Sequence, residues 1–156
     1  VSRGVLRIGH VGDSRAYLVT PHGIEQLTDD HSVVGEMLRS GLITAEEAAA
    51  HPKRHAITRA LGFFDDLEVD MGEWPVRPGD VVVLCTDGLH DLVSPEEIRA
   101  AFVESRDTSS ACDDLVSLAR SHGGHDNITV VACVVTESDM LGPSPAPEEA
   151  AGGSEP

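Results

Sequence analysis

The sequence has few basic residues. Lysine and arginine together number 11 against 27 aspartates and glutamates in 156 residues, which gives a formal charge of −16 at pH 7. Such an acidic surface repels nucleic acid and anionic lipid, so we expect no nucleic-acid partner and no basic-patch function. A metal site is compatible with this composition, because hard cations take carboxylate ligands.

Long apolar runs are also absent. No run approaches the length of a membrane span, and Val1–Leu18 lacks the uninterrupted apolar region of a secretory signal. We therefore expect no membrane segment in this chain and no export signal at its start.

Cysteine is scarce, and its spacing excludes several chemistries. The three cysteines, Cys85, Cys112 and Cys133, form no C-x-x-C pair, which excludes a zinc ribbon and a thioredoxin-like motif. None of them is followed six residues later by arginine, so the phosphate-binding loop of a cysteine-nucleophile phosphatase is missing. Cys85 and Cys133 lie in apolar runs and are expected to be buried. A reducing, cytoplasmic compartment fits this usage.

The most informative stretch is VVVLCTDGL, Val81–Leu89. A short apolar run that is rich in β-branched residues and follows a Pro-Gly-Asp turn predicts a strand buried on both faces. Asp87 places a carboxylate where this strand leaves the core, and Gly88 allows a sharp turn without the penalty of a Cβ atom. An ordinary turn would also explain Asp-Gly, because this dipeptide is a common turn signal.

Other apolar patterns predict further strands over residues 5–11, 16–19, 24–28, 67–74 and 128–135, the first three forming a meander and the last buried. Ser32, Thr44 and Ser94 are N-cap candidates for three helices, the last two with a glutamate three residues later, and a fourth helix is expected over about 110–121. Consecutive strands followed by grouped helices favour an α+β layered fold of antiparallel sheets with helices packed outside.

Three aspartates share one context. Asp13, Asp87 and Asp126 each interrupt or border an apolar strand beside glycine or asparagine. Carboxylates are rarely buried unless they are paired or bound to metal, and only Asp13 has a nearby arginine, Arg15. If the three strand ends converge, a divalent cation is the natural partner, and all-oxygen ligation favours Mg²⁺ or Mn²⁺.

Other polar residues are weaker candidates. Four histidines lie in loops or at helix ends without i, i+4 pairing and are expected to be solvated or structural: His51, His55, His122 and His125.

Four segments, in order, resemble the bacterial form of the metal-dependent serine/threonine protein phosphatases, the PPM or type 2C family. They are GHVGDSRAYLV, LTDDHSVVGEMLRSGLITAEEAAAHPKRHAITRALG, VVVLCTDGLHDLV and GGHDNITVVACVV. The similarity runs from about Leu6 to Val135. It implies a PPM-type four-layer α-β-β-α sandwich of antiparallel sheets flanked by helices, with the N-terminal part missing here.

The resemblance also implies an activity and a set of ligands. Family members hydrolyse phosphoserine and phosphothreonine in proteins with a water held between two Mn²⁺ or Mg²⁺ ions, so no protein nucleophile is needed. The resemblance implies that Asp87 and Asp126 bind the first catalytic metal and that Asp13 helps to hold a third metal. Residues 29–61 resemble the mobile flap beside the family's active site. From this flap Arg59 could meet a substrate phosphate, but a surface ion pair is the simpler expectation.

One departure from the family pattern limits this expectation. The family's N-terminal part carries a phosphate-binding arginine, a Glu-Asp pair and an Asp-Gly-x-Gly-Gly segment whose aspartate bridges both metals, and none of these is present here. Two function classes therefore remain: a protein phosphatase represented by its C-terminal portion, or a non-catalytic phosphatase-like module that binds a partner.

Both ends of the chain carry their own expectations. A strand starts almost at Val1, which suggests missing N-terminal sequence; the alternative is a genuine start with an edge strand. We expect residues 1–136 to form the C-terminal portion of the phosphatase domain. Residues 137–156, rich in proline, glycine, alanine and glutamate, are expected to form a disordered tail.

Overall fold

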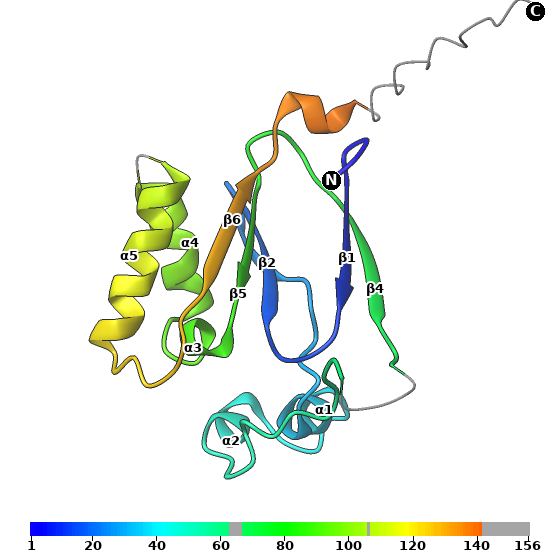
Figure 1. The fold of residues 1–156 in the computed structure, drawn as a ribbon, viewed down its shortest axis with the longest axis vertical. Coiled ribbons are helices and arrows are strands. Elements are labelled where there is room, and N and C mark those ends of the chain that lie inside the picture. The colour runs from blue at the N-terminus through cyan, green and yellow to red at the C-terminus, as the bar shows by residue number, and fades with distance from the viewer. Residues whose placement is uncertain (63–66, 106, 142–156) are drawn as a thin grey trace, which may run out of the picture.

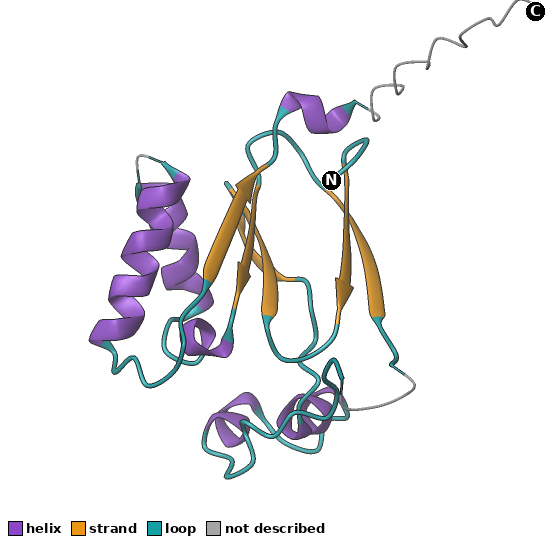
Figure 2. Cartoon of the chain, in the orientation of Figure 1, coloured by secondary structure: helices purple, strands orange, loops and turns teal. Residues whose placement is uncertain are grey.

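The computed structural model describes residues 1–62, 67–105 and 107–141. Strands and helices alternate in groups, as the sequence predicts (Figure 2). The elements in chain order are β1 (Val5–His10), β2 (Arg15–Thr20), β3 (Gly23–Gln26), α1 (Val33–Arg39), α2 (Ala45–Ala49), β4 (Asp70–Pro75), β5 (Val81–Cys85), α3 (Asp87–His90), α4 (Pro95–Glu104), α5 (Thr108–Ser121), β6 (Val130–Val134) and the 3-10 helix η1 (Glu137–Met140).

The centre of the fold is a four-stranded antiparallel sheet in the order β3-β2-β5-β6. Helices α3, α4 and α5 lie on one side of this sheet, and the strands β1 and β4 stand on the other (Figure 1). The fold is therefore of the mixed α+β class, with antiparallel sheets and helices packed outside.

The predicted meander is wrong for the first strand. β1 pairs with β4 in a separate two-stranded antiparallel sheet, with Val5 opposite Pro75 and His10 opposite Asp70. Only β2 and β3 form the expected hairpin. The β4 strand begins at Asp70 rather than at residue 67, because its pairing with β1 ends at His10.

Two hydrophobic clusters form the core, and alternate residues of β2 supply both. Tyr17 and Val19 pack with the helices in the first cluster, which also contains Leu89, Ile98 and Leu115. The opposite face of the strand contributes to the second cluster, which lies between the sheets and contains Leu6, Ala16, Leu18, Leu27, Val76, Val82 and Val135. This division follows from the period of two in a β-strand.

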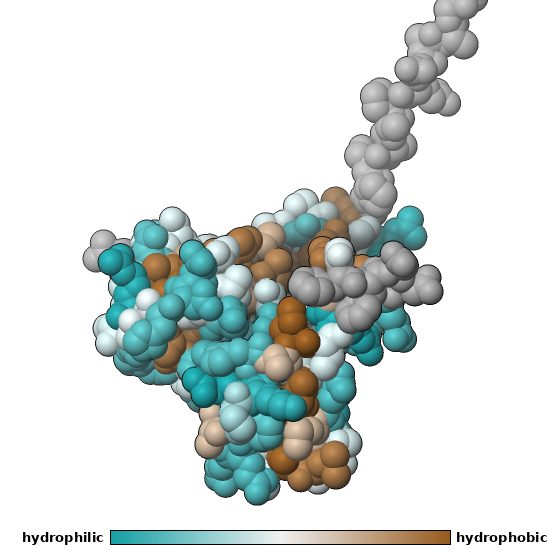
Figure 3. Space-filling model, turned by 60° about the horizontal axis from the view of Figure 1, so that its bottom comes forward, coloured by the Kyte–Doolittle hydropathy of each residue, from teal (hydrophilic) through white to brown (hydrophobic). Residues whose placement is uncertain are grey.

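The starts of α1, α2 and α4 follow local signals, whereas the sequence does not predict α3, and α5 begins at Thr108 rather than at about residue 110. Ser32 caps α1 by accepting a hydrogen bond from the backbone N–H of Gly35, and Thr44 and Ser94 form the predicted capping boxes of α2 and α4. α1 and α2 project at one end of the sheets (Figure 1). Seen from that end, apolar residues lie among polar ones on the surface (Figure 3).

β6 is not the buried strand that its sequence predicts. It is an edge strand, and its face turned away from the helices is open, so that Val131 is 54% exposed and Cys133 is exposed rather than buried. The register places Val131 opposite Leu84 of β5, which is itself 45% exposed. Cys85 is buried, as expected.

The chain beyond β6 begins with an ordered turn. Glu137–Met140 forms η1, the N–H of Gly4 donates to the carbonyl of Asp139 at 3.0 Å, and Met140 packs against the second cluster. The expected tail therefore does not begin at residue 137, and its remainder, 142–156, lies outside the described residues. None of the described helices is long and apolar enough to span a membrane.

Candidate metal centre

The register of the central sheet brings the three aspartate segments to one end of the fold. Arg15 of β2 lies opposite Cys85 of β5, and Cys85 lies opposite Val130 of β6. Asp13 lies two residues before Arg15, Asp87 begins α3 two residues after Cys85, and Asp126 lies four residues before Val130. The three segments therefore meet the same end of the central sheet, which is drawn lowest in Figure 1. Hydrogen-bonded pairing of the strands thus brings three segments that are far apart in sequence to the same end of the sheet.

Asp87 begins the short helix α3 directly after β5. Its carboxylate accepts a hydrogen bond from the backbone N–H of Gly88 at 2.8 Å, and it stands in the first turn of the helix, where negative charge is favoured. The strand-to-helix junction, rather than an ordinary loop, therefore fixes this carboxylate at the sheet end.

The Asp126 segment is held directly against this junction. The hydroxyl of Thr86 donates to the carbonyl of Asn127 at 3.0 Å and accepts from the N–H of Thr129 at 3.1 Å. The N–H of Thr86 also donates to the carbonyl of Thr129 at 3.2 Å. The Asp126 carboxylate accepts from the N–H of Asn127 at 2.7 Å.

Gly88 is required for a different reason from the one that the sequence suggests. It lies in a helix without a left-handed backbone conformation, so the turn itself does not need glycine. A Cβ atom at this position would instead stand 2.4 Å from the carbonyl oxygen of Asn127 and 2.9 Å from its carbonyl carbon. The missing side chain allows the Asp87 and Asp126 segments to pack backbone to backbone.

Asp13 approaches Asp87 from the connection between β1 and β2. Burial, and next the nearby charge of Asp87, raise the pKa of the Asp13 carboxyl above its ordinary value. The Nε2 atom of His90, on α3, lies 3.0 Å from the carbonyl oxygen of Asp13. Arg15 does not offset this charge, because it forms a bidentate ion pair with Asp30 at 2.7–2.9 Å.

The donor set fits a hard cation in part. Asp13 and Asp87 are close enough to repel each other, the third carboxylate lies on an adjoining segment, and all are oxygen ligands of the kind that Mg²⁺ and Mn²⁺ prefer. Within residues 1–62, 67–105 and 107–141, however, no three His, Cys, Asp or Glu side chains are grouped closely enough to hold an ion by themselves.

Sequence reasoning missed two buried histidines beside Asp13. His31 is 1% exposed, and its ring contacts the N–H of Gly12 at 3.1 Å and Asp70 at 2.9 Å. The side chain of His90 is 3% exposed. The only available signal for His31 was its position in a polar run before a helix cap, which does not reveal partners 19 and 39 residues away.

Arg59 and three of the four weaker histidine candidates have structural partners. Arg59 forms an ion pair with Asp70 at 2.8 Å, as expected for a surface arginine. His55 lies 3.5 Å from Asp91, and His122 contacts the carbonyl of Leu92 at 2.8 Å. His51 accepts from the N–H of Lys53 at 3.1 Å. These contacts give no support to a metal-binding role.

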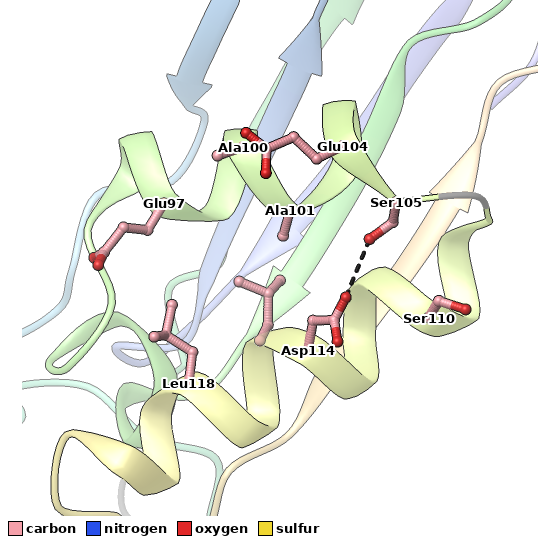
Figure 4. A pocket seen from close by; sticks show the side chains of 9 residues that line it. Glu97, Ala100, Ala101, Glu104, Ser105, Ser110, Asp114 and Leu118 are labelled. Carbon is pink, nitrogen blue, oxygen red and sulfur yellow. Dashed lines mark hydrogen bonds between the residues drawn. The ribbon is translucent and has the colours of Figure 1, made fainter.

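A surface cavity of about 540 Å³ lies between α4 and α5 (Figure 4). Its lining includes Glu97, Glu104 and Asp114 but none of the three aspartates at the sheet end, and Asp114 accepts a hydrogen bond from Ser105 at 3.3 Å. This cavity is therefore separate from the candidate metal centre.

Comparison with known proteins connects this arrangement to one family. The family model described as stage II sporulation protein E (SpoIIE) matches residues 31–136. The serine/threonine phosphatase stp of Listeria monocytogenes is 43% identical over 124 residues, which are 80% of this chain and 49% of that protein. The protein phosphatase PhpP of Streptococcus pneumoniae is 39% identical over 130 residues, which are 83% of this chain and 53% of that protein.

Solved structures agree with the sequence matches. The S. agalactiae serine/threonine phosphatase superposes with a TM-score of 0.80 at 37% identity, covering 86% of this chain and 55% of that one. The catalytic domain of the phosphatase PstP in complex with two manganese ions superposes with a TM-score of 0.76 at 36% identity, covering 88% and 56%. The chain thus spans about half the length of the curated relatives it matches.

Proposed function

Because the chain belongs to the bacterial PPM family of serine/threonine phosphatases, we propose that it forms the C-terminal portion of a metal-dependent phosphatase domain. The substrates of that whole domain are phosphoserine and phosphothreonine in other proteins. Residues 1–136 with η1 belong to the domain, and the tail lies beyond them. The three unpaired cysteines are consistent with a reducing, cytoplasmic site of action.

The proposed metal ligands are Asp13, Asp87 and Asp126, and the ions are Mn²⁺ or Mg²⁺. The observation that carries the proposal is the common sheet end, where pairing of β2, β5 and β6 brings the three segments together. There, burial and next the charge of Asp87 raise the pKa of the Asp13 carboxyl. When bound, such ions supply an activated water and positive charge for the phosphate oxygens. The two manganese ions of PstP support this choice.

The proposal assigns a role to each of the three aspartates and to Gly88. Asp87, at the start of α3, Asp126, on the adjoining segment, and Asp13, close enough to Asp87 to feel its charge, would supply oxygen ligands to the ions. The close packing at Gly88 maintains the separation of the first two segments. No residue here takes the place of the bridging aspartate or the phosphate-binding arginine of the family's N-terminal part.

We also propose that the whole domain has the four-layer α-β-β-α arrangement. In this chain, α4 and α5 provide one helical layer, the central sheet provides the next, and β1 with β4 provides part of the second sheet. The open face at Leu84 and Val131 supports this view, because apolar residues on a sheet face normally pack against another layer.

The alternative is a non-catalytic, phosphatase-like module that binds a partner. The absence of the family's N-terminal ligands from this sequence favours it for the chain in isolation. Two-metal hydrolysis requires both ions a few ångströms apart, and the residues here supply ligands for only part of that arrangement. We therefore expect little or no phosphatase activity from this chain alone.

The test compares hydrolysis of an aryl phosphate and a phosphothreonine peptide with Mn²⁺ by this chain and by an N-terminally extended version. Activity should appear only in the extended version and should be lost in its Asp87→Ala variant. Asp113→Ala, an exposed substitution on α5, is the matched control and should keep full activity. An inactive extended version that still binds Mn²⁺ would favour the non-catalytic alternative. Robust turnover by the present chain would contradict the reasoning on missing ligands.

A further inference from the structure

Two buried histidines account for the backbone polar groups of the loop that carries Asp13. The N–H of Gly12 donates to Nδ1 of His31 at 3.1 Å, and the carbonyl of Gly12 accepts from the N–H of His31 at 2.8 Å. The next carbonyl, that of Asp13, contacts Nε2 of His90 at 3.0 Å. The loop is thus held from two sides, by a residue that precedes α1 and by a residue of α3.

The partners of His31 define its tautomer. Because the N–H of Gly12 is a donor, Nδ1 must accept and Nε2 carries the hydrogen. Nε2 then donates to Asp70 at 2.9 Å, and the other carboxylate oxygen of Asp70 accepts from Arg59 at 2.8 Å. The surface ion pair between Asp70 and Arg59 therefore orients the ring of His31, which is 1% exposed and contacts the Asp13 loop.

His90 connects the Asp13 loop to the helix that carries Asp87. It lies three residues after Asp87 on the same short helix, and its Nε2–H donates to the carbonyl of Asp13. A movement of α3 would therefore move Asp87 and the support of Asp13 together. Both ring nitrogens of His31 and Nε2 of His90 contact a backbone group or a carboxylate, whereas Nδ1 of His90 has no hydrogen-bond partner among the described residues and lies 3.3 Å from the carboxylate of Asp91.

We propose that His31 and His90 are positioning residues that hold the carboxylate of Asp13 opposite that of Asp87 for cation binding. This inference rests on the proposed metal site. Gly12 has a φ of +115°, which other residues rarely adopt, and the side-chain contacts of His31 and His90 help to hold the loop in this conformation. Residues that orient a ligand in this way affect metal affinity although they do not touch the ion.

A purely structural role would predict a different result. If the two histidines only fill the interior, their replacement would lower thermal stability without changing the affinity of the folded protein for Mn²⁺. The decisive comparison is therefore between substitutions of similar size that keep or remove the hydrogen bond to the loop.

The experiment measures Mn²⁺ affinity from the electron paramagnetic resonance signal of free Mn²⁺, together with hydrogen exchange of the Gly12 amide. His31→Leu and His90→Leu remove the contacts and should weaken Mn²⁺ binding by about tenfold. His31→Asn keeps an acceptor near Nδ1, and His90→Gln keeps a donor near Nε2, so both should recover most of the affinity. Gly12 exchange should accelerate in His31→Leu and remain slow in His31→Asn.

Two further variants separate this effect from loss of the fold. Val76→Ala weakens the second core cluster beside Gly4, at the end of β1 opposite to the Asp13 loop, and should leave Mn²⁺ affinity unchanged. Asp70→Ala removes the partner of His31 on the surface and should weaken Mn²⁺ binding even if His31→Leu does not fold. Folded Leu variants and Asp70→Ala with wild-type affinity would overturn the positioning role. Failure of the unsubstituted chain to bind Mn²⁺ would instead overturn the metal site on which it rests.

Discussion

Replacement of Gly88 by alanine tests the packing that brings Asp87 and Asp126 together. The new Cβ atom would stand 2.4 Å from the carbonyl oxygen and 2.9 Å from the carbonyl carbon of Asn127, both of them backbone atoms that no rotamer change can move. Either α3 or the Asp126 segment must shift. The hydrogen bonds of Thr86 to Asn127 and Thr129 oppose that shift.

The magnitude follows from two opposing effects. Overpacking costs about 1–3 kcal/mol, and a rigid backbone contact places this site near the upper value. Alanine returns about 1 kcal/mol through its better helix propensity at a helical position. A net loss of about 2 kcal/mol remains, which corresponds to roughly 4–8 °C in the unfolding midpoint of a chain of this length. Mn²⁺ affinity should fall as well, because the carboxylate separation changes.

The assay is thermal unfolding followed by circular dichroism, with Gly23→Ala as the control. Gly23 has no atom within 4 Å of its ideal Cβ position and no left-handed backbone, so alanine there should leave the midpoint almost unchanged. A Gly88→Ala midpoint equal to that of the unsubstituted chain would refute the close approach of the two segments.

Three further outcomes are expected. Asp13→Asn should raise the unfolding midpoint at pH 7. Folding raises the pKa of the Asp13 carboxyl, and therefore the contribution of this carboxyl to stability falls as the pH rises above the ordinary pKa of an aspartate. The increase in midpoint should become smaller as the pH is lowered toward the ordinary pKa of an aspartate. An increase that does not depend on pH would refute this explanation. Ser94→Ala removes a capping box and should cost about 1 kcal/mol in urea unfolding, whereas an unchanged midpoint would contradict the cap. Truncation after Thr136 should lower the midpoint, because it removes the carbonyl that pairs with Gly4 and the Met140 contact, whereas truncation after Leu141 should not; equal midpoints would show that η1 adds nothing.

Local signals in the sequence were sufficient for the starts of α1, α2 and α4, but not for α3, where a turn was expected. Ser32, Thr44 and Ser94 cap helices through contacts three residues away, so each cap is encoded within one turn. The three aspartates could be selected because an acidic residue at the edge of an apolar strand is conspicuous.

Features that depend on distant partners could not be predicted in this way. Pairing of β1 with β4 joins residues about 65 positions apart, and neither strand carries a signal for its partner, so the meander was the simpler expectation. Cys133 lies in a run as apolar as that around Cys85, and only its place on an edge strand exposes it. His31 is buried because Gly12 and Asp70 meet around it, which requires the tertiary fold.

The alternating faces of β5 have a consequence for how the molecule unfolds. Val83 and Cys85 belong to the cluster under the helices, and Val82 belongs to the cluster between the sheets. Neither cluster can lose its packing without disturbing a strand that the other requires, so the helical side and the β1–β4 side should melt in a single cooperative transition. Amide hydrogens of β5 should accordingly exchange only when the whole molecule opens.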